Sequence, residues 1–335
     1  MKIKNEKENT MKRTTKILSL LLAALILAAG FSLVSCKKDD TTELRVAVLN
    51  GTTGWGAAPL ISRIKSGESK LNAKIDTYTD ATMVSPLIIN GDADIAAVPT
   101  NLAAVLYNKT QGGVRVLAVN TLGVLYLLEN GETVNSLSDL AGKTVYLPGQ
   151  GSNPEFILRA LVDGAKVENV TFDYTYSSPD ELATALASGK ATLGVLPEPK
   201  VTAVTSKKDT IRVALDFTEE WKKQTSAPLV QGCIIVREEF LKEHTALVEK
   251  FLDEYKKSVE YVNSNPEEAS AMIAEAGLAG NAAVAKSALP RCNITYLDGA
   301  DMRTALEGFW SALFALDPKS VGGKLPDSAL TAPIK

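Results

Sequence analysis

Hydroxyl, amide and backbone N–H groups gather in four short segments that follow predicted strands. These segments are residues 50–56, 100–101 and 149–153 and the position of Glu198. Groups of this kind orient small solutes, and ligands of open α/β sheets bind beyond the carboxyl ends of the strands. Asn120, Thr121 and Gln231 are added because the chain is predicted to pass between two lobes next to them. The candidate ligand-binding residues are therefore Thr52, Thr53, Trp55, Thr100, Asn101, Asn120, Thr121, Gln150, Ser152, Asn153, Glu198 and Gln231.

Several candidates have a purely structural alternative. Ser152 and Glu155 have the spacing of a capping box, so the alternative for Ser152 is a helix cap. The alternative for Trp55 is the hydrophobic core, and the alternative for Asn101 is the first turn of a helix. Glu198 lies between two prolines, a setting that packing alone explains poorly. We therefore expect Glu198 in the ligand site.

The chain lacks the side chains expected of a hydrolase or a metalloenzyme. His244 is its only histidine and lies in a charged segment, so a Ser-His-Asp triad is not predicted. Cys36, Cys233 and Cys292 are too few and too far apart for a zinc cluster. The glycines of residues 51–56 lack the spacing of a dinucleotide-binding turn. The sequence predicts a binding protein, not an enzyme, with no cofactor and no metal.

The N-terminal region has the pattern of an export signal followed by a lipid attachment site. A basic region over residues 12–16 precedes an uncharged apolar run over residues 17–29. Residues 33–36, Leu-Val-Ser-Cys, look like a bacterial lipobox. That pattern implies a signal peptide over residues 1–35 and a diacylglycerol on Cys36, which would anchor the protein to the cell membrane outside the cytoplasm.

Two features of this region have alternatives. An uncleaved transmembrane helix over residues 17–34 would be only marginally long for a hydrocarbon core about 30 Å thick. Met11 is a second candidate start, since the ten residues before it are polar apart from Met1 and Ile3. In each case the rest of the chain is tethered outside the cytoplasm, with the polar residues 36–43 as a flexible tether.

That location bears on the two later cysteines and on the partners. Cys233 and Cys292 are predicted either to form a disulfide, which an oxidising compartment permits, or to be two buried free thiols.

The 335-residue chain has a net charge of −3, and loss of residues 1–35, with six basic and two acidic side chains, leaves −7. Because no basic stripe is present, nucleic acid is not a predicted partner.

Strand-like and helix-like segments alternate along the chain, and the pattern occurs twice. Residues 90–99, Asn-Gly-Asp-Ala-Asp-Ile-Ala-Ala-Val-Pro, align with residues 188–197, Ser-Gly-Lys-Ala-Thr-Leu-Gly-Val-Leu-Pro. Each stretch predicts a glycine that ends a helix, a buried strand and a proline that stops the strand. The repeat predicts two α/β lobes, each a parallel sheet covered by helices.

The order of the segments predicts that the chain passes between the lobes twice. The helical tail after residue 237 has no sheet of its own, so we expect it to pack on the first lobe. The apolar strand over residues 229–236 would rejoin the first sheet. Lobe 1 is therefore predicted to comprise residues 44–121 and 232–335, and lobe 2 residues 122–231, with the two connections acting as a hinge.

Three motifs resemble a known family. Asn-Gly-Asp-Ala-Asp-Ile-Ala at residues 90–96, Leu-Ser-Asp-Leu-Ala-Gly-Lys-Thr-Val at 137–145 and Gly-Val-Leu-Pro-Glu-Pro at 194–199 occur in the family's order. They are similar to ABC-transporter substrate-binding proteins of the nitrate, sulfonate, taurine and thiamine-pyrimidine-precursor group. The chain departs from this pattern at Pro197, where relatives often have an aromatic residue, and it lacks the cysteine-rich motif of the fungal pyrimidine-synthesis relatives.

The resemblance implies the type II periplasmic-binding-protein fold, with two Rossmann-like lobes joined by a two-strand hinge. It also implies a solute-binding receptor that delivers a small molecule to an ABC permease and its ATPase. A surface adhesin or signalling receptor on the same scaffold is the alternative function, followed by an exported enzyme.

The class of solute is predicted from Glu198 and Trp55. The candidate loops contain no Lys and no Arg, and a buried carboxylate needs a donor or a cation as its partner. An aromatic face stacks on a flat ring or on a cation. A neutral or cationic heteroaromatic solute is therefore favoured over the alternative, a small oxyanion bound by the N–H groups of residues 149–153 at a helix N-terminus.

Overall fold

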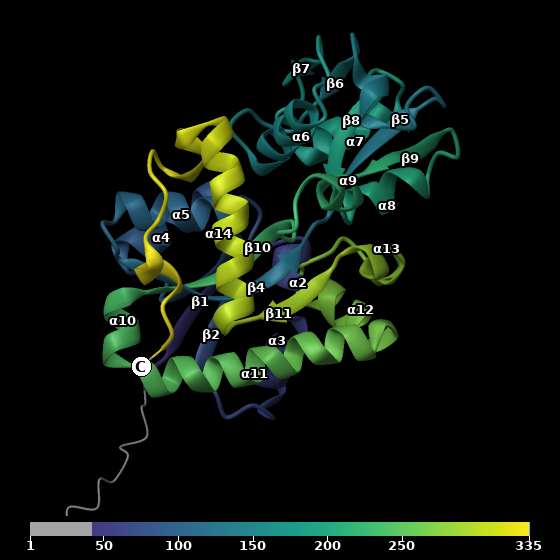
Figure 1. The fold of residues 1–335 in the computed structure, drawn as a ribbon. Helices are drawn as coiled ribbons and strands as arrows, with labels where there is room; N and C mark the ends of the chain where they lie inside the picture. The colour runs from purple at the N-terminus through teal and green to yellow at the C-terminus, as the bar shows by residue number, and fades with distance from the viewer. Residues whose placement is uncertain (1–41, 335) are drawn as a thin grey trace, which may run out of the picture. The chain divides into compact units, whose positions relative to one another are not determined.

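The computed structural model describes residues 42–334, and this part of the chain belongs to one compact unit. Its strands form two β-sheets with helices between and around them (Figure 1). The predicted signal peptide, the lipobox and most of the tether lie outside the described residues. No helix within residues 42–334 has the length and apolar character needed to cross a bilayer.

The first sheet has six strands in the order β11-β4-β10-β3-β1-β2. Strand β1 pairs in parallel with β2 and β3, whereas β10 is antiparallel to β3 and β4, and β11 is antiparallel to β4. The strands are β1 (Leu44–Leu49), β2 (Ala73–Tyr78), β3 (Ile95–Pro99), β4 (Val114–Leu122), β10 (Val230–Arg237) and β11 (Ile294–Leu297).

The second sheet has five strands in the order β7-β6-β8-β5-β9. Strand β6 is parallel to β7 and β8, and β5 is antiparallel to β8 and β9. Both sheets are therefore mixed, and the prediction of purely parallel sheets is wrong. The strands are β5 (Leu125–Asn130), β6 (Thr144–Tyr146), β7 (Thr171–Asp173), β8 (Leu193–Pro197) and β9 (Ile211–Asp216).

The helices cover these sheets through their apolar faces. In α11 the spacing of Leu247, Phe251, Tyr255 and Val259 gives one buried stripe, as expected for a 3.6-residue period. The α-helices are α2 (Thr52–Trp55), α3 (Ala58–Ser66), α4 (Ala81–Asn90), α5 (Thr100–Lys109), α6 (Asn153–Gly164), α7 (Pro179–Ala187), α8 (Lys200–Thr205), α9 (Phe217–Gln224), α10 (Glu238–Glu243), α11 (Thr245–Ser264), α12 (Pro266–Glu275), α13 (Ala282–Ala288) and α14 (Gly299–Leu316). Short 3-10 helices are η1 (Leu137–Leu140), η2 (Leu289–Arg291), η3 (Pro318–Val321) and η4 (Ser328–Thr331).

The internal repeat predicted from the sequence is present in the structure. Gly91 ends α4 at φ 78°, and Gly189 follows the end of α7 at φ 77°. Both glycines have left-handed backbone, which a residue with a Cβ adopts only at a cost. Strands β3 and β8 follow, almost fully buried, and end at Pro99 and Pro197.

The chain passes from the first sheet to the second through residues 123–124, and returns through residues 225–229. The two connections pack against each other at Gly123. A Cβ added there would lie 2.1 Å from Thr218 Oγ1 and 3.0 Å from Leu229 Cδ2, so only glycine fits. Because residues 42–335 form one compact unit, the division into two lobes stays a prediction.

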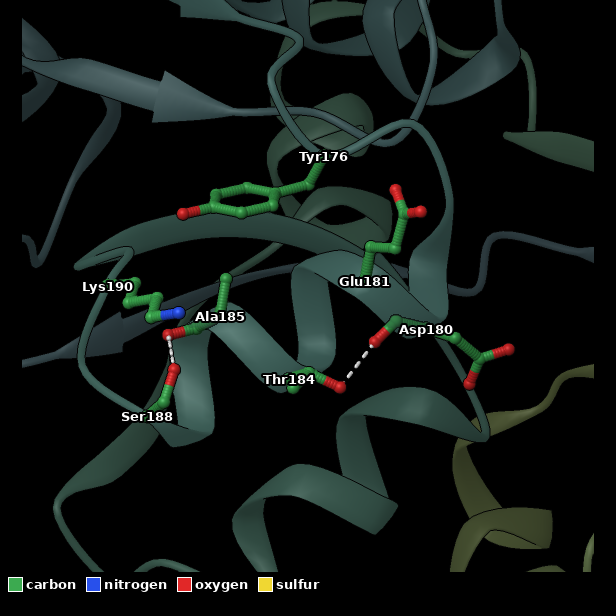
Figure 2. Close-up of a pocket in the computed structure, with 7 residues that line it drawn as sticks. All are labelled: Tyr176, Asp180, Glu181, Thr184, Ala185, Ser188 and Lys190. Atoms are coloured by element: carbon green, nitrogen blue, oxygen red, sulfur yellow. Dashed lines mark hydrogen bonds between the residues drawn. The ribbon is translucent and has the colours of Figure 1, made fainter.

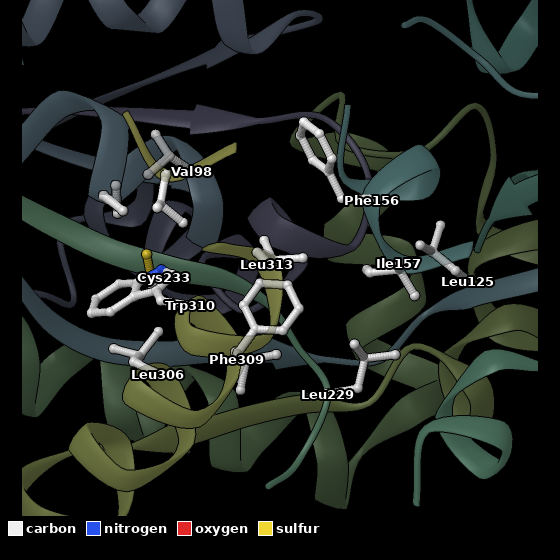
Figure 3. Close-up of a cluster of buried hydrophobic side chains, with 14 of the residues drawn as sticks. Val98, Leu125, Phe156, Ile157, Leu229, Cys233, Leu306, Phe309, Trp310 and Leu313 are labelled. Atoms are coloured by element: carbon white, nitrogen blue, oxygen red, sulfur yellow. The ribbon is translucent and has the colours of Figure 1, made fainter. Parts of the chain in front are cut away.

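The largest hydrophobic cluster is continuous across the two connections (Figure 3). It combines Val98 and Cys233 from the first sheet, Leu125 from the second sheet, Ile157 from α6 and Phe309 from α14. The helical tail after residue 237 therefore contributes to a core that also contains side chains from the second sheet.

Candidate functional site

Four of the candidate residues meet at the carboxyl ends of β1 and β4. Asn120 Nδ2 donates to the carbonyl oxygen of Thr53 at 2.8 Å and to Tyr255 Oη at 3.1 Å. Thr121 Oγ1 donates to Asn120 Oδ1 at 3.1 Å and to the carbonyl oxygen of Thr52 at 3.5 Å. These bonds hold the short helix α2 against the end of β4. The structure thus brings together four candidates from two separate segments, Thr52 and Thr53 after β1 and Asn120 and Thr121 near the end of β4.

Strand β10 begins beside this cluster. A Cβ added to Gly232 would lie 2.6 Å from Asn120 Oδ1, so the glycine permits a close backbone approach. Its neighbour Gln231 is 8% exposed, and Gln231 Nε2 has no hydrogen-bond partner in the described part of the chain. Thr100 Oγ1 donates to the carbonyl oxygen of Val230 at 3.0 Å. Asn101, half-buried, is the second residue of α5.

The loop before α6 holds three more candidates. Ser152 is the N-cap residue of α6, but its hydroxyl donates to the carbonyl oxygens of Pro148 and Gly149, at 3.2 and 2.7 Å, instead of accepting from the helix. Gln150 is exposed. Asn153 is 9% exposed, and no group among the described residues bonds its Oδ1. The alternative of a capping box at Ser152 is therefore wrong.

Glu155 closes the same loop from inside α6. Its Oε2 accepts from the N–H of Gly151 at 2.6 Å, and its Oε1 accepts from Arg159 Nε at 2.8 Å. Burial raises the pKa of Glu155, but the hydrogen bonds from Gly151, Tyr174 and Arg159 outweigh that effect and lower the pKa below its usual value. An ionised Glu155 thus holds the loop of residues 149–153 in place.

Trp55 lies in the core and not in a ligand site. Its side chain is 0% exposed, and Nε1 donates to the carbonyl oxygen of Leu278 at 3.0 Å. It belongs to the hydrophobic cluster formed by Leu60, Phe251 and Tyr255 among others. An indole that is enclosed and has its N–H satisfied offers no face for stacking, so the prediction that Trp55 contacts solute is corrected.

Glu198 has a partner within the chain. Arg291 Nε donates to Glu198 Oε1 at 2.6 Å, and Thr202 donates to the carboxylate through its hydroxyl and its N–H, at 3.0 and 3.1 Å. The carboxylate is buried, with Glu198 1% exposed. Its need for a donor or a cation is met by Thr202 and Arg291, so Glu198 no longer supports the preference for a neutral or cationic solute.

The two later cysteines are free, buried thiols and do not form a disulfide. Cys233 packs in the cluster that contains Phe309, whereas Cys292 packs in the cluster that contains Phe251, and its Sγ donates to the carbonyl oxygen of Ala288 at 3.2 Å. Burial raises the pKa of both thiols, which keeps them protonated.

Two surface hollows flank α7. One, of about 370 Å³, lies between Tyr176, Lys190 and one face of α7 (Figure 2). The other, of about 400 Å³, lies between α7, α8 and the start of α13 near Asn281. None of the candidate residues lines either hollow. Within residues 42–334 no group of three or more His, Cys, Asp or Glu side chains could hold a metal ion.

Sequence reasoning missed Arg291, Thr202 and Tyr126 as neighbours of Glu198. Thr202 lies one helical turn after Glu198, a spacing that could have been noticed. Arg291 is 93 residues away in sequence and lies in a tail that was interpreted as helical. No local pattern in the sequence pairs it with Glu198.

Comparison with known proteins places this fold in a family. The family model described as "NMT1/THI5 like" matches residues 68–269, more than half of the chain. No curated protein sequence matches the chain.

Solved structures give the same fold. An ABC transporter protein from Parabacteroides distasonis is 23% identical with a TM-score of 0.74, and the match covers 88% of this chain and 100% of that one. The periplasmic aliphatic sulphonate binding protein of Escherichia coli is 18% identical with a TM-score of 0.67, covering 85% and 92%. A Candida albicans protein described as having the generic periplasmic binding protein fold is 16% identical with a TM-score of 0.60, covering 86% and 93%.

These matches confirm the family and the fold that the three sequence motifs predicted: the chain belongs to the NMT1/THI5-like family and has the periplasmic-binding-protein fold.

Proposed function

We propose that the protein is the extracytoplasmic solute-binding receptor of an ABC importer and acts without catalysis. The family match supports a binding role, and the structural relatives include proteins described as ABC transporter and sulphonate-binding components. In this proposal lobe 1 (residues 44–121 and 232–335) and lobe 2 (residues 122–231) close over a small molecule and present it to a permease and its ATPase.

The observation that carries the proposal is a pair of buried amide groups. Gln231 Nε2, a donor, and Asn153 Oδ1, an acceptor, have no hydrogen-bond partner among the described residues. Leaving a buried polar group unpaired costs about 1–3 kcal/mol, so such a group calls for a ligand or a water molecule. Both belong to segments that the sequence predicted as ligand-binding: Gln231 lies on β10 of the first sheet, and Asn153 is the first residue of α6.

The same pair defines the solute by its hydrogen-bonding pattern. In this proposal Gln231 Nε2 donates to an acceptor on the solute, and Asn153 Oδ1 accepts from a donor on it. With Trp55 in the core and Glu198 paired with Arg291, the preference for a neutral or cationic heteroaromatic solute over an oxyanion loses its two supports. We therefore propose a polar solute that carries both a hydrogen-bond acceptor and a hydrogen-bond donor. Such a solute can belong to the neutral or cationic class or to the oxyanions.

Removing either amide should weaken solute binding. We expect Gln231→Ala and Asn153→Ala each to raise the Kd about tenfold, because each deletes one buried hydrogen bond. A thermal-shift panel of nitrate, sulfonates, pyrimidines, purines and flavins first finds a stabilising compound, and titration of that compound then gives the Kd. At a hundred times its Kd the solute should stabilise the fold by about 2.7 kcal/mol.

Asn90→Ala is the control, since Asn90 is an exposed amide at the end of α4, and it should leave the Kd unchanged. Equal Kd values in all three variants would refute the assignment of the two amides to the site.

The anchor is the second part of the proposal. We propose that Cys36 carries a diacylglycerol and that residues 1–35 are removed, on the basis of the Leu-Val-Ser-Cys sequence. Cys36→Ala should then move the protein from the membrane fraction to the soluble fraction or block its processing, because the lipid is its only proposed anchor. Intact-mass analysis of the membrane-extracted protein checks this. An unmodified Cys36, or a mass that includes residues 1–35, would contradict it.

A further inference from the structure

Residues 291–293, here called the brace, touch both sides of the first connection between the sheets. On the first-sheet side, the carbonyl oxygen of Asn293 accepts from the N–H of Leu122 at 3.1 Å, and Asn293 Nδ2 donates to the carbonyl oxygen of Gly123 at 2.6 Å. Asn293 has left-handed backbone at φ 44°, which asparagine tolerates better than most residues. One residue thus binds the backbone of two consecutive residues where β4 ends.

Arg291 makes the contacts on the second-sheet side. Its Nε donates to Glu198 Oε1 at 2.6 Å, and its Nη2 donates to Thr202 Oγ1 at 2.8 Å. Its carbonyl oxygen accepts from Tyr126 Oη at 3.2 Å, and its guanidinium lies 6.0 Å from the centre of the Tyr126 ring. Tyr126 is the second residue of β5, and Glu198 directly follows β8, which pairs with β5. Arg291 thus contacts the second sheet where these two neighbouring strands begin and end.

The brace itself belongs to the first sheet through its chain neighbours. Ile294, the next residue, begins β11, which pairs with β4. Glu198 in turn directly follows β8 of the second sheet, and its N–H donates to the carbonyl oxygen of Val124, the residue before β5, at 2.9 Å. Moving one sheet away from the other would therefore separate Arg291 from Glu198 and leave a buried carboxylate without its cation, which is strongly unfavourable.

We propose that the brace sets the equilibrium between closed and open arrangements of the two sheets. It adds an ion pair and hydrogen bonds to the two covalent connections and to the hydrophobic cluster that the two sheets share. Its rupture is costly because the carboxylate of Glu198 is fully buried, although the Arg291 side chain is 41% exposed. The apparent Kd equals the intrinsic Kd divided by the fraction of molecules in the arrangement that binds solute. A protein held in that arrangement therefore has a lower apparent Kd. That consequence for affinity rests on the proposed function, whereas the link itself does not.

Hydrogen exchange of the solute-free protein tests the brace without any ligand. The main variant is Arg291→Met with Glu198→Gln, which removes the ion pair and leaves no unpaired buried charge. We expect amide exchange in residues 120–126 and at Leu196 and Glu198 to become at least about tenfold faster, while β1 and β6 keep their rates. Asn293→Ala, which removes the bond to Gly123, should accelerate residues 120–126 in the same way.

The matched control is Arg212→Met with Glu129→Gln. Glu129 is also a buried carboxylate that accepts from the hydroxyl and the N–H of a threonine four residues later, Thr133, and from an arginine. Arg212 and Glu129 both belong to the second sheet. The control should leave residues 120–126 unchanged. Unchanged exchange at the connection in the Arg291 double variant, or equal acceleration in the control, would overturn the proposal. Because no solute is present, neither result depends on solute binding.

Discussion

Trp55→Ala is expected to lower the free energy of unfolding by about 3–5 kcal/mol, the usual cost of truncating a large buried aromatic side chain. The indole is fully enclosed and its N–H is bonded to the carbonyl oxygen of Leu278. Truncation leaves a cavity in the hydrophobic cluster that contains Leu60 and Phe251. It also removes one of the two hydrogen bonds to that carbonyl, which still accepts from the N–H of Gly51 at 3.1 Å. Denaturant unfolding of the purified protein measures the loss.

Trp55→Phe separates the two contributions. It keeps most of the buried ring and loses the bond to Leu278, so we expect a smaller loss, about 1–3 kcal/mol. A residue that stacks on solute would behave differently: Trp55→Ala would then leave the free energy of unfolding within about 1 kcal/mol and would abolish solute binding. That result would restore Trp55 to the ligand site and contradict its place in the core.

The second large effect is expected at Arg291. Arg291→Met should destabilise the fold by about 3–5 kcal/mol, because it leaves the carboxylate of Glu198 buried without a cation. Adding Glu198→Gln to the same chain should recover most of the loss, since a neutral amide still pairs with Thr202 and carries no charge. The free energies of the two single variants and the double variant form a cycle that isolates the interaction.

Additive effects of the two substitutions would contradict a direct pair between Arg291 and Glu198. This cycle measures the global free energy of unfolding, whereas hydrogen exchange reports local opening at the connection. The two measurements can therefore disagree, and a strong coupling without local opening would assign the pair to stability alone.

Most strands could be predicted because their apolar residues form short runs bounded by glycine and proline. The strand predicted at residues 229–236 rejoins the first sheet as β10, Val230–Arg237. Strand β5 was missed because it starts only three residues after β4 ends, so the two form one long apolar stretch. Strand β11 was missed because four residues within a helical tail give no period to detect.

The candidate site was predictable only where the neighbouring residues lie at strand ends. The carboxyl ends of β1 and β4 meet by topology, so Thr52, Thr53, Asn120 and Thr121 could be grouped from the sequence. The pairing of Glu198 depends instead on a tail residue, Arg291, whose position is set by tertiary packing. The inference about solute charge lost its basis for that reason. It considered only the candidate loops, which contain no Lys or Arg, and not a cationic side chain that the fold brings from a distant segment, such as Arg291.

Native mass spectrometry tests the central claim most directly, that this protein binds a small molecule through Gln231 and Asn153. The purified protein is mixed with the small-molecule extract of its own host and its growth medium, and the spectrum is compared with that of the Gln231→Ala, Asn153→Ala double variant. The account predicts a discrete one-to-one adduct on the wild-type protein that is lost or greatly reduced in the double variant. A spectrum that shows only unliganded wild-type protein, or an adduct equally populated in the double variant, would contradict it.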